Sequence, residues 1–101
     1  MPAKRPAYFT LRGRRWRVRW VRGLVDDDGK SVWGLCDYAA RTISIERDQP
    51  PDAMPDTVIH EILHVSFPSA REKRIRRAAS DLLRALTRLG LVQIPKEPTT
   101  L

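Results

Sequence analysis

The sequence has a single cysteine, Cys36, so this chain cannot form an intramolecular disulfide. No apolar run approaches the roughly 20 residues of a membrane span. The basic N-terminus is not followed by the apolar core of a signal peptide. These absences predict a reducing, cytoplasmic setting and no membrane partner.

The chain is also short, with 101 residues. This length fits one small domain and leaves no room for two. We therefore expect a single domain over residues 1–101, with a loose basic arm at 1–7 and an extended tail at 91–101. Apolar residues make up 42% of the chain, which allows a core. Such a core is thin, and a bound metal would help to stabilise it.

Acidic residues are missing from the first part of the chain, although the formal net charge is only +7. Residues 1–25 contain no aspartate or glutamate, and their basic residues are Lys4, Arg5, Arg12, Arg14, Arg15, Arg17, Arg19 and Arg22. A basic surface attracts polyanions, so nucleic acid is one candidate partner. A solvated charged face is the simpler interpretation of the same residues.

The stretch RRWRVRWVR at 14–22 alternates arginines with Trp16, Val18 and Trp20. A period of two predicts a strand with one aromatic face and one cationic face. The aromatic face is expected to point into the core. Because the arginines then point to the opposite side, we expect an exposed cationic strand face.

Two further strands are predicted in VWGLCDY at 32–38 and RTISIE at 41–46. Together with the strand at 14–22, they predict a small three-stranded, largely antiparallel sheet. Cys36 is expected to be a small buried residue of this sheet. The alternative for Cys36 is an additional zinc ligand.

Two helices should follow the sheet. Pro55 suits a first helical turn and Pro68 disfavours helix at the preceding residue, so the first helix should run over about 54–66. An apolar stripe at helical spacing predicts a second helix over about 70–89, which Gly90 ends. The fold class is therefore α+β, with the sheet packed on two helices.

The first predicted helix contains the sequence HEILH, and both histidines of the chain lie in it. His60 and His64 are four residues apart, so they share one face of the helix and can bind one ion. Imidazole nitrogens suit zinc. Glu61 lies about 100° around the helix from His60 and can act as a base without being a ligand. The alternative is a pair of buried histidines, each of which would need a hydrogen-bond partner.

A catalytic zinc needs a third protein ligand, and the downstream acidic candidates are Glu72, Asp81 and Glu97. Helical geometry places Glu72 at the edge of the apolar stripe and near His64 across the turn, whereas Asp81 faces solvent and Glu97 lies in the tail. We therefore expect Glu72 to be the ligand. The competing interpretation is a capping box, in which Glu72 reaches back to Ser69.

HEILH followed by an acidic residue on a second helix resembles the minigluzincins, which are very small zincin metallopeptidases. The segments GLCDYAARTISIE and PSAREKRIRRAASDLLRALTRLG also resemble short phage-encoded HEXXH proteins. The resemblance covers roughly residues 14–90. It implies a minimal zincin fold with His60, His64 and Glu72 as zinc ligands and Glu61 as the general base.

The resemblance implies a zinc metallopeptidase that hydrolyses peptide bonds through a zinc-bound water activated by Glu61. A peptide or protein substrate would lie antiparallel to an edge strand, for which the 41–46 segment is the candidate. The isolated chain is latent if the tail 91–101 fills the cleft. No histidine or tyrosine follows residue 64, so either Tyr8, Tyr38 or an arginine stabilises the oxyanion or the stabiliser is missing.

A second function of a different class stays open. The chain would then be a non-catalytic domain that zinc stabilises and that binds nucleic acid or a protein partner through its basic surface.

Overall fold

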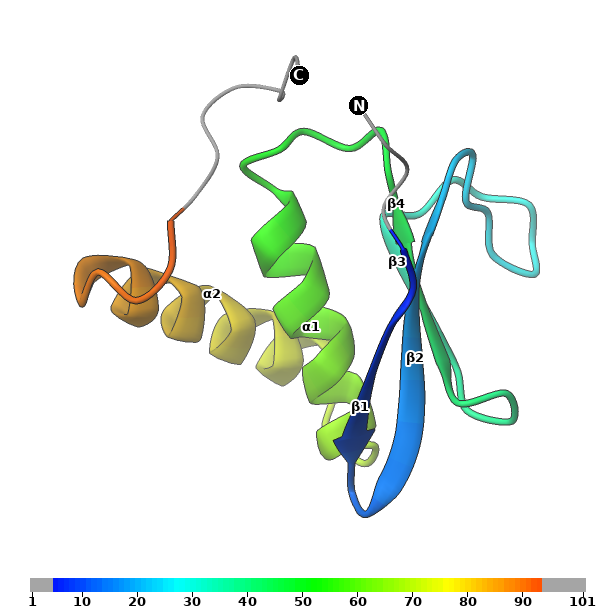
Figure 1. Cartoon of the computed structure of the whole chain (residues 1–101), viewed down its shortest axis with the longest axis horizontal. Helices are drawn as coiled ribbons and strands as arrows, with labels where there is room; N and C mark the ends of the chain where they lie inside the picture. The colour runs from blue at the N-terminus through cyan, green and yellow to red at the C-terminus, as the bar shows by residue number, and fades with distance from the viewer. Residues whose placement is uncertain (1–4, 94–101) are drawn as a thin grey trace.

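The computed structural model describes residues 5–93. Four strands precede two helices along the chain (Figure 1). The elements are β1 (Ala7–Leu11), β2 (Arg14–Val21), β3 (Gly34–Asp37), β4 (Thr42–Glu46), α1 (Met54–Ser66) and α2 (Glu72–Arg88). This arrangement confirms the α+β class.

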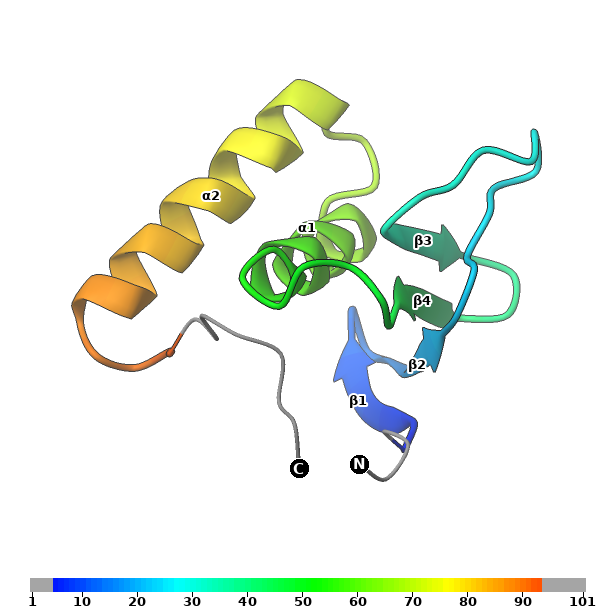
Figure 2. The same ribbon diagram turned by 90° about the horizontal axis from the view of Figure 1, so that it is seen from above.

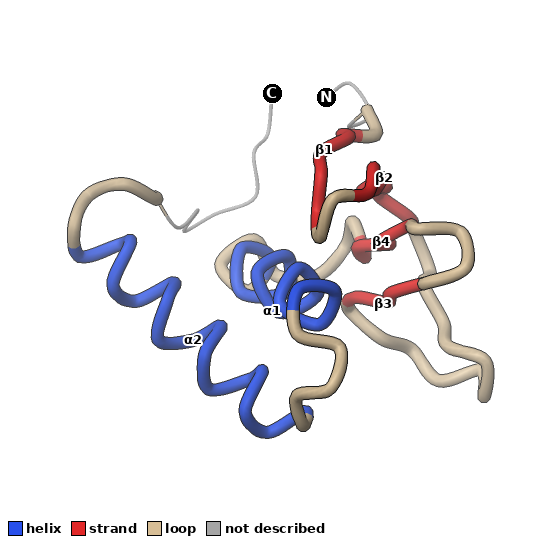
Figure 3. The backbone as a smooth tube through the Cα atoms, turned by 90° about the horizontal axis from the view of Figure 1, so that it is seen from below, coloured by secondary structure: helices blue, strands red, loops and turns tan. Residues whose placement is uncertain are grey.

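The four strands form one mixed sheet in the order β1-β2-β4-β3, seen nearly end-on in Figure 3. β1 pairs antiparallel with β2, β2 pairs parallel with β4, and β4 pairs antiparallel with β3. α1 lies between the sheet and α2 (Figure 2). The opposite face of the sheet is covered by neither helix.

The expected three-stranded, largely antiparallel sheet is wrong in two respects. Ala7–Leu11 adds a strand in front of β2, so Ala7 belongs to the sheet and not to the loose arm predicted over 1–7. β4 lies between β2 and β3 and runs parallel to β2. The physical reason is burial, because Thr42 to Ile45 are all buried and a strand buried on both faces belongs at the centre of a sheet.

One apolar core fills the space between the sheet and α1. Its buried members are Trp16, Val18, Ile43, Ile45 and Val65. The two isoleucines are fully buried and supply the largest enclosed side chains. The alternation predicted for β2 is thus confirmed, with its aromatic side in the core and Arg15 and Arg19 exposed.

The helices match the sequence signals closely. α1 has the predicted bounds, with a proline in its first turn and its end just before Phe67 and Pro68. α2 begins two residues later than predicted and ends one residue earlier. Gly90 follows with a φ of 76°, a left-handed conformation that glycine adopts at helix ends without strain.

α2 packs on α1 through a narrow stripe formed by Ile75, Ala79 and Leu83. Among the described elements, α2 contacts α1 alone. Within the described residues, no helix is both long and apolar enough to cross a membrane. The predicted tail 91–101 lies largely outside the described residues, and so does its expected role in blocking a cleft.

Candidate metal centre

α1 and α2 bring the three predicted ligands together. His60 and His64 lie one turn apart on α1, on the side that faces the beginning of α2. Glu72 is the first residue of α2, so the short connection after Pro68 returns its carboxylate to the two imidazoles. A helical spacing and one tight turn are enough to build this cluster.

The ligand atoms are close to one another. His60 Nε2 lies 2.8 Å from Glu72 Oε1, and His64 Nε2 lies 2.7 Å from Glu72 Oε2. The two Nε2 atoms are 3.1 Å apart. Bonds of ~2.0–2.1 Å to a tetrahedral ion place two ligand atoms roughly 3.3 Å apart. Shifts of a few tenths of an ångström would therefore fit His60, His64 and Glu72 around one metal ion.

Without a cation, the two Nε2 atoms and the Glu72 carboxylate cannot all form favourable hydrogen bonds with one another. If each Nε2 carries the proton that the carboxylate accepts, two N–H groups lie side by side at 3.1 Å. If one Nε2 is unprotonated, its lone pair faces a carboxylate oxygen. A metal ion removes both conflicts, because all three groups then offer lone pairs to the same centre.

Glu61 lies on the side of α1 that faces β3, and its side chain is 9% exposed. The Cys36 thiol donates to Glu61 Oε1 at 3.2 Å and lies 3.4 Å from the Glu61 carbonyl oxygen. Burial, followed by the nearby Glu61 carboxylate, raises the pKa of Cys36 well above its ordinary range. Cys36 is thus a neutral donor to Glu61 and lies outside the ligand cluster.

Gly34 provides the space that Glu61 occupies. A Cβ atom added at Gly34 would lie 2.7 Å from Glu61 Cγ and 2.9 Å from Glu61 Oε2. It would also lie 2.9 Å from Thr57 Cγ2. β3 therefore approaches α1 closely at this point because residue 34 has no side chain. In the sequence, the one sign of this role is that Gly34 lies inside a predicted strand, where a glycine permits a close approach.

A hollow of about 460 Å³ opens beside the cluster. Its lining includes Trp33, His60, Glu61, Glu72 and Arg76. Nη2 of Arg76 lies 3.6 Å from Glu72 Oε1, one helical turn further along α2. Trp33 is half exposed. The hollow thus offers one cation and one aromatic surface beside the ligands.

β3 forms the edge of the sheet next to this hollow, so the expectation that 41–46 is the edge strand is wrong. Residues 42–46 form the interior strand β4 instead. The Glu46 N–H donates to the Trp33 carbonyl at 2.8 Å. Because bonded and non-bonded pairs alternate in an antiparallel ladder, Gly34 and Cys36 direct their backbone N–H and C=O groups to the open edge.

The other candidates lie elsewhere. Arg71, not Ser69, precedes the first residue of α2 and makes no side-chain cap, so the predicted capping box does not form. Asp81 is exposed and lies 3.5 Å from Arg84. Glu97 is outside the described residues.

The two tyrosines weighed as oxyanion stabilisers lie in different places. Tyr38 donates its hydroxyl proton to the His64 carbonyl at 3.1 Å, at the end of α1. Burial raises the pKa of Tyr38, with smaller effects from Cys36 and Glu61. Tyr8 belongs to β1 and stacks under Arg15, away from the ligand cluster. Tyr38 thus uses its hydroxyl proton at the end of α1, whereas Arg76 lines the hollow beside the ligands.

Comparisons with family models, with curated proteins and with solved structures each find no match for this chain. Within the described part of the chain, His60, His64 and Glu72 are close enough to hold a metal ion.

Proposed function

We propose that this chain is a zinc-dependent peptidase in which His60, His64 and Glu72 hold the ion and Glu61 is the general base. The observation that carries the proposal is the convergence of these three ligand atoms within 4.8 Å, with Glu61 beside them and facing the same hollow. Two imidazoles and one carboxylate are a ligand set of catalytic zinc, which keeps a fourth position open.

When bound, zinc would lower the pKa of water toward about 7 and polarise a carbonyl group. Glu61 would accept a proton from the attacking water and pass it to the leaving amine. Cys36 would hold the Glu61 carboxylate in place through its thiol. Arg76 would lie beside the same hollow and offer a positive charge to the developing oxyanion.

The open edge of β3 supports an extended peptide as the substrate. A peptide that adds to this edge would pair with the backbone of Gly34 and Cys36, and main-chain pairing of this kind does not depend on the peptide's sequence. The scissile bond would then lie next to Glu61. The helix α1 carries HEILH and packs against this edge strand. This arrangement also supports the minimal zincin fold that the resemblance implies.

The first test is the zinc content of the native protein and of two variants, His64→Ala and Glu72→Ala, by elemental analysis. We expect about one zinc ion per native chain and almost none in either variant. Asp81→Ala is the matched control, since it removes an exposed carboxylate from the same helix and should keep the zinc. A native protein that takes up no added zinc would overturn the proposal.

The second test separates catalysis from binding. A mixed peptide library is incubated with the native protein and with Glu61→Gln, and new termini are identified by mass spectrometry. We expect Glu61→Gln to keep its zinc and to lose about 10²–10⁴-fold in rate, the usual contribution of a general base. Full hydrolysis by this variant would reject the assignment of Glu61.

One observation favours a second function, a non-catalytic zinc-stabilised domain. α2 packs on α1 through a narrow stripe, and its first residue, Glu72, joins the histidines of α1. A metal at this point would fasten α2 to the molecule. If zinc is bound, chelation unfolds α2 and no peptide in the library is cleaved, the structural role replaces the catalytic one.

A further inference from the structure

A basic surface surrounds the end of the sheet where the β1–β2 turn meets the β3–β4 turn. Two hollows lie there, of about 400 Å³ and about 310 Å³. They share Trp16 and Arg41 and meet at this end of the sheet, the larger on the face that carries α1 and the smaller on the opposite face. We call this surface the basic groove, and its charged and exposed aromatic residues are Tyr8, Arg12, Arg14, Arg15, Arg17, Tyr38 and Arg41.

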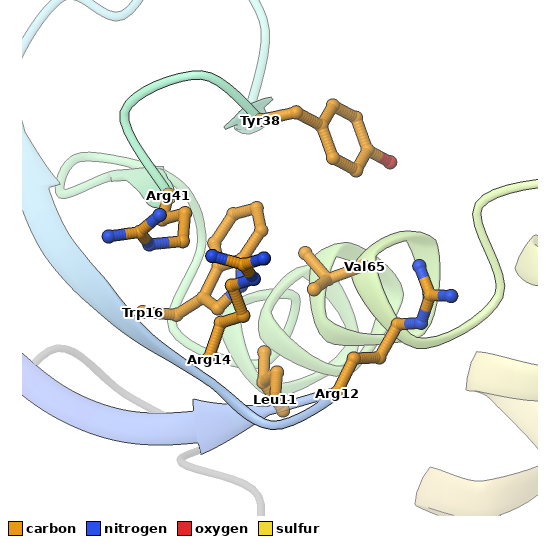
Figure 4. Close-up of a pocket in the computed structure, with 7 residues that line it drawn as sticks. All are labelled: Leu11, Arg12, Arg14, Trp16, Tyr38, Arg41 and Val65. Carbon is orange, nitrogen blue, oxygen red and sulfur yellow. The ribbon is translucent and has the colours of Figure 1, made fainter.

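The larger hollow has an apolar floor and a charged rim. Figure 4 shows Arg12, Arg14 and Arg41 reaching it from the β1–β2 turn, the beginning of β2 and the β3–β4 turn. Trp16 and Val65 are buried and form its floor. No aspartate or glutamate lines either hollow among the described residues.

The charges of the basic groove are not neutralised within the described part of the chain. Among the described residues, the arginines that form ion pairs are Arg22, Arg76 and Arg84. None of these three lines the basic groove. Arg41 donates from Nε to the Arg15 carbonyl at 3.2 Å, which anchors it across the two turns. Five arginines without carboxylate partners produce a strong positive potential, and a polyanion is the complementary ligand.

Two exposed aromatic rings belong to the basic groove, Tyr8 on the open face of the sheet and Tyr38 at the larger hollow. Tyr8 is 53% exposed and Tyr38 is 51% exposed. The Arg15 guanidinium lies 4.5 Å from the centre of the Tyr8 ring. Tyr38 contacts the edge of Trp16 at 5.9 Å between ring centres, and its hydroxyl is bound to His64. Both rings are thus held in fixed positions, which lowers the entropy cost of a ligand that stacks on them.

We propose that the basic groove binds single-stranded nucleic acid. A flexible strand passes around the end of the sheet, so that arginines contact the phosphates while unpaired bases stack on the exposed tyrosine rings and enter the hollows. A duplex hides its bases and presents only phosphates, so it would use the charge but neither ring. An acidic protein would also use the charge alone. The inference does not depend on the proposed peptidase activity, because none of these residues is a metal ligand.

The test is fluorescence anisotropy of the full chain with a labelled oligonucleotide of mixed sequence, at about 50 mM and about 200 mM salt. If all five arginines contact phosphates, a salt slope near −0.7 per contact predicts roughly 100-fold weaker binding at the higher concentration. A duplex of the same sequence and an unstructured polyglutamate chain should bind more weakly at the same salt. No binding at low salt would overturn the proposal.

Variants locate the surface. The double substitution Arg14→Gln with Arg41→Gln should weaken binding at least about 10-fold and reduce the salt slope by about 1.4. The matched control, Arg84→Gln with Arg88→Gln, removes the same charge from the exposed side of α2 and should change affinity little. Equal losses in the two double variants would mean unspecific attraction and would reject the basic groove.

Tyr38→Leu distinguishes nucleic acid from other polyanions. Loss of one stacked base predicts at least about 5-fold weaker oligonucleotide binding with an unchanged salt slope, whereas polyglutamate binding should not change. Circular dichroism of each variant checks that the fold is kept. Polyglutamate that binds as tightly as the oligonucleotide, with no effect of Tyr38→Leu on either, would point to an acidic protein partner and overturn the proposal.

Discussion

Replacing Gly34 by alanine should displace the proposed general base while leaving the metal ligands in place. The added Cβ would lie 2.7 Å from Glu61 Cγ, about 0.7 Å short of the 3.4 Å at which ordinary van der Waals contact begins. Two further atoms, Glu61 Oε2 and Thr57 Cγ2, would lie at 2.9 Å. Because β3 and α1 pack directly on each other here, either Glu61 must turn away or the strand must move.

Both outcomes have a cost that can be measured. Overpacking of a close contact costs about 1–3 kcal/mol, and each kcal/mol lowers Tm by roughly 4–8 °C in a domain of this size. A displacement approaching 1 Å in a catalytic group costs on the order of 10²-fold in rate. We therefore expect Gly34→Ala to have a lower Tm, to keep its zinc and to hydrolyse peptides far more slowly.

The control is Gly29→Ala, in the exposed turn before β3. Gly29 has a φ of 80° and no atom within 4 Å of an added Cβ, so its cost of about 1–2 kcal/mol comes from the backbone alone. It should lower Tm by a similar amount without changing the rate per zinc ion. If Gly34→Ala matches the native protein in both Tm and rate, the close approach of β3 to Glu61 is refuted.

Three further predictions concern the ion, the core and the cysteine. Zinc at about 100 times its Kd should raise stability by about 2.7 kcal/mol in the native protein and not in His64→Ala, as thermal melts with and without zinc will show; an equal rise in the variant would contradict the ligand assignment. Ile43→Ala should cost about 2–5 kcal/mol in denaturant unfolding, because Ile43 is fully buried, and a loss below about 1 kcal/mol would place it outside the core. Burial, then Glu61, raises the folded-state pKa of Cys36, so its contribution to stability is complete below about pH 8.5 and declines above it. Tm should therefore fall more steeply above about pH 8.5 in the native protein than in Cys36→Ala, and identical slopes would refute the effect.

Short-range patterns in the sequence were sufficient for the helices and for the ligand cluster. Proline and glycine positions gave the bounds of α1 to the residue and those of α2 within two residues. The spacing of His60 and His64 placed both on one face of a helix, and a short turn limited where Glu72 can lie. These properties depend on neighbours within a few residues, where backbone geometry leaves little choice.

The tertiary structure decided which strands are neighbours and what surrounds Glu61. Nothing local distinguishes an interior strand from an edge strand until both faces of β4 are seen to be buried. The same holds for Gly34 and Cys36, which meet Glu61 across 25 residues or more of chain. The sequence by itself therefore determined the fold class, the helices and the three candidate ligands, because these follow from local periodicity. Only the packed fold could place β3 at the edge beside Glu61 and gather five arginines into the basic groove, because those arrangements depend on contacts between segments distant in sequence.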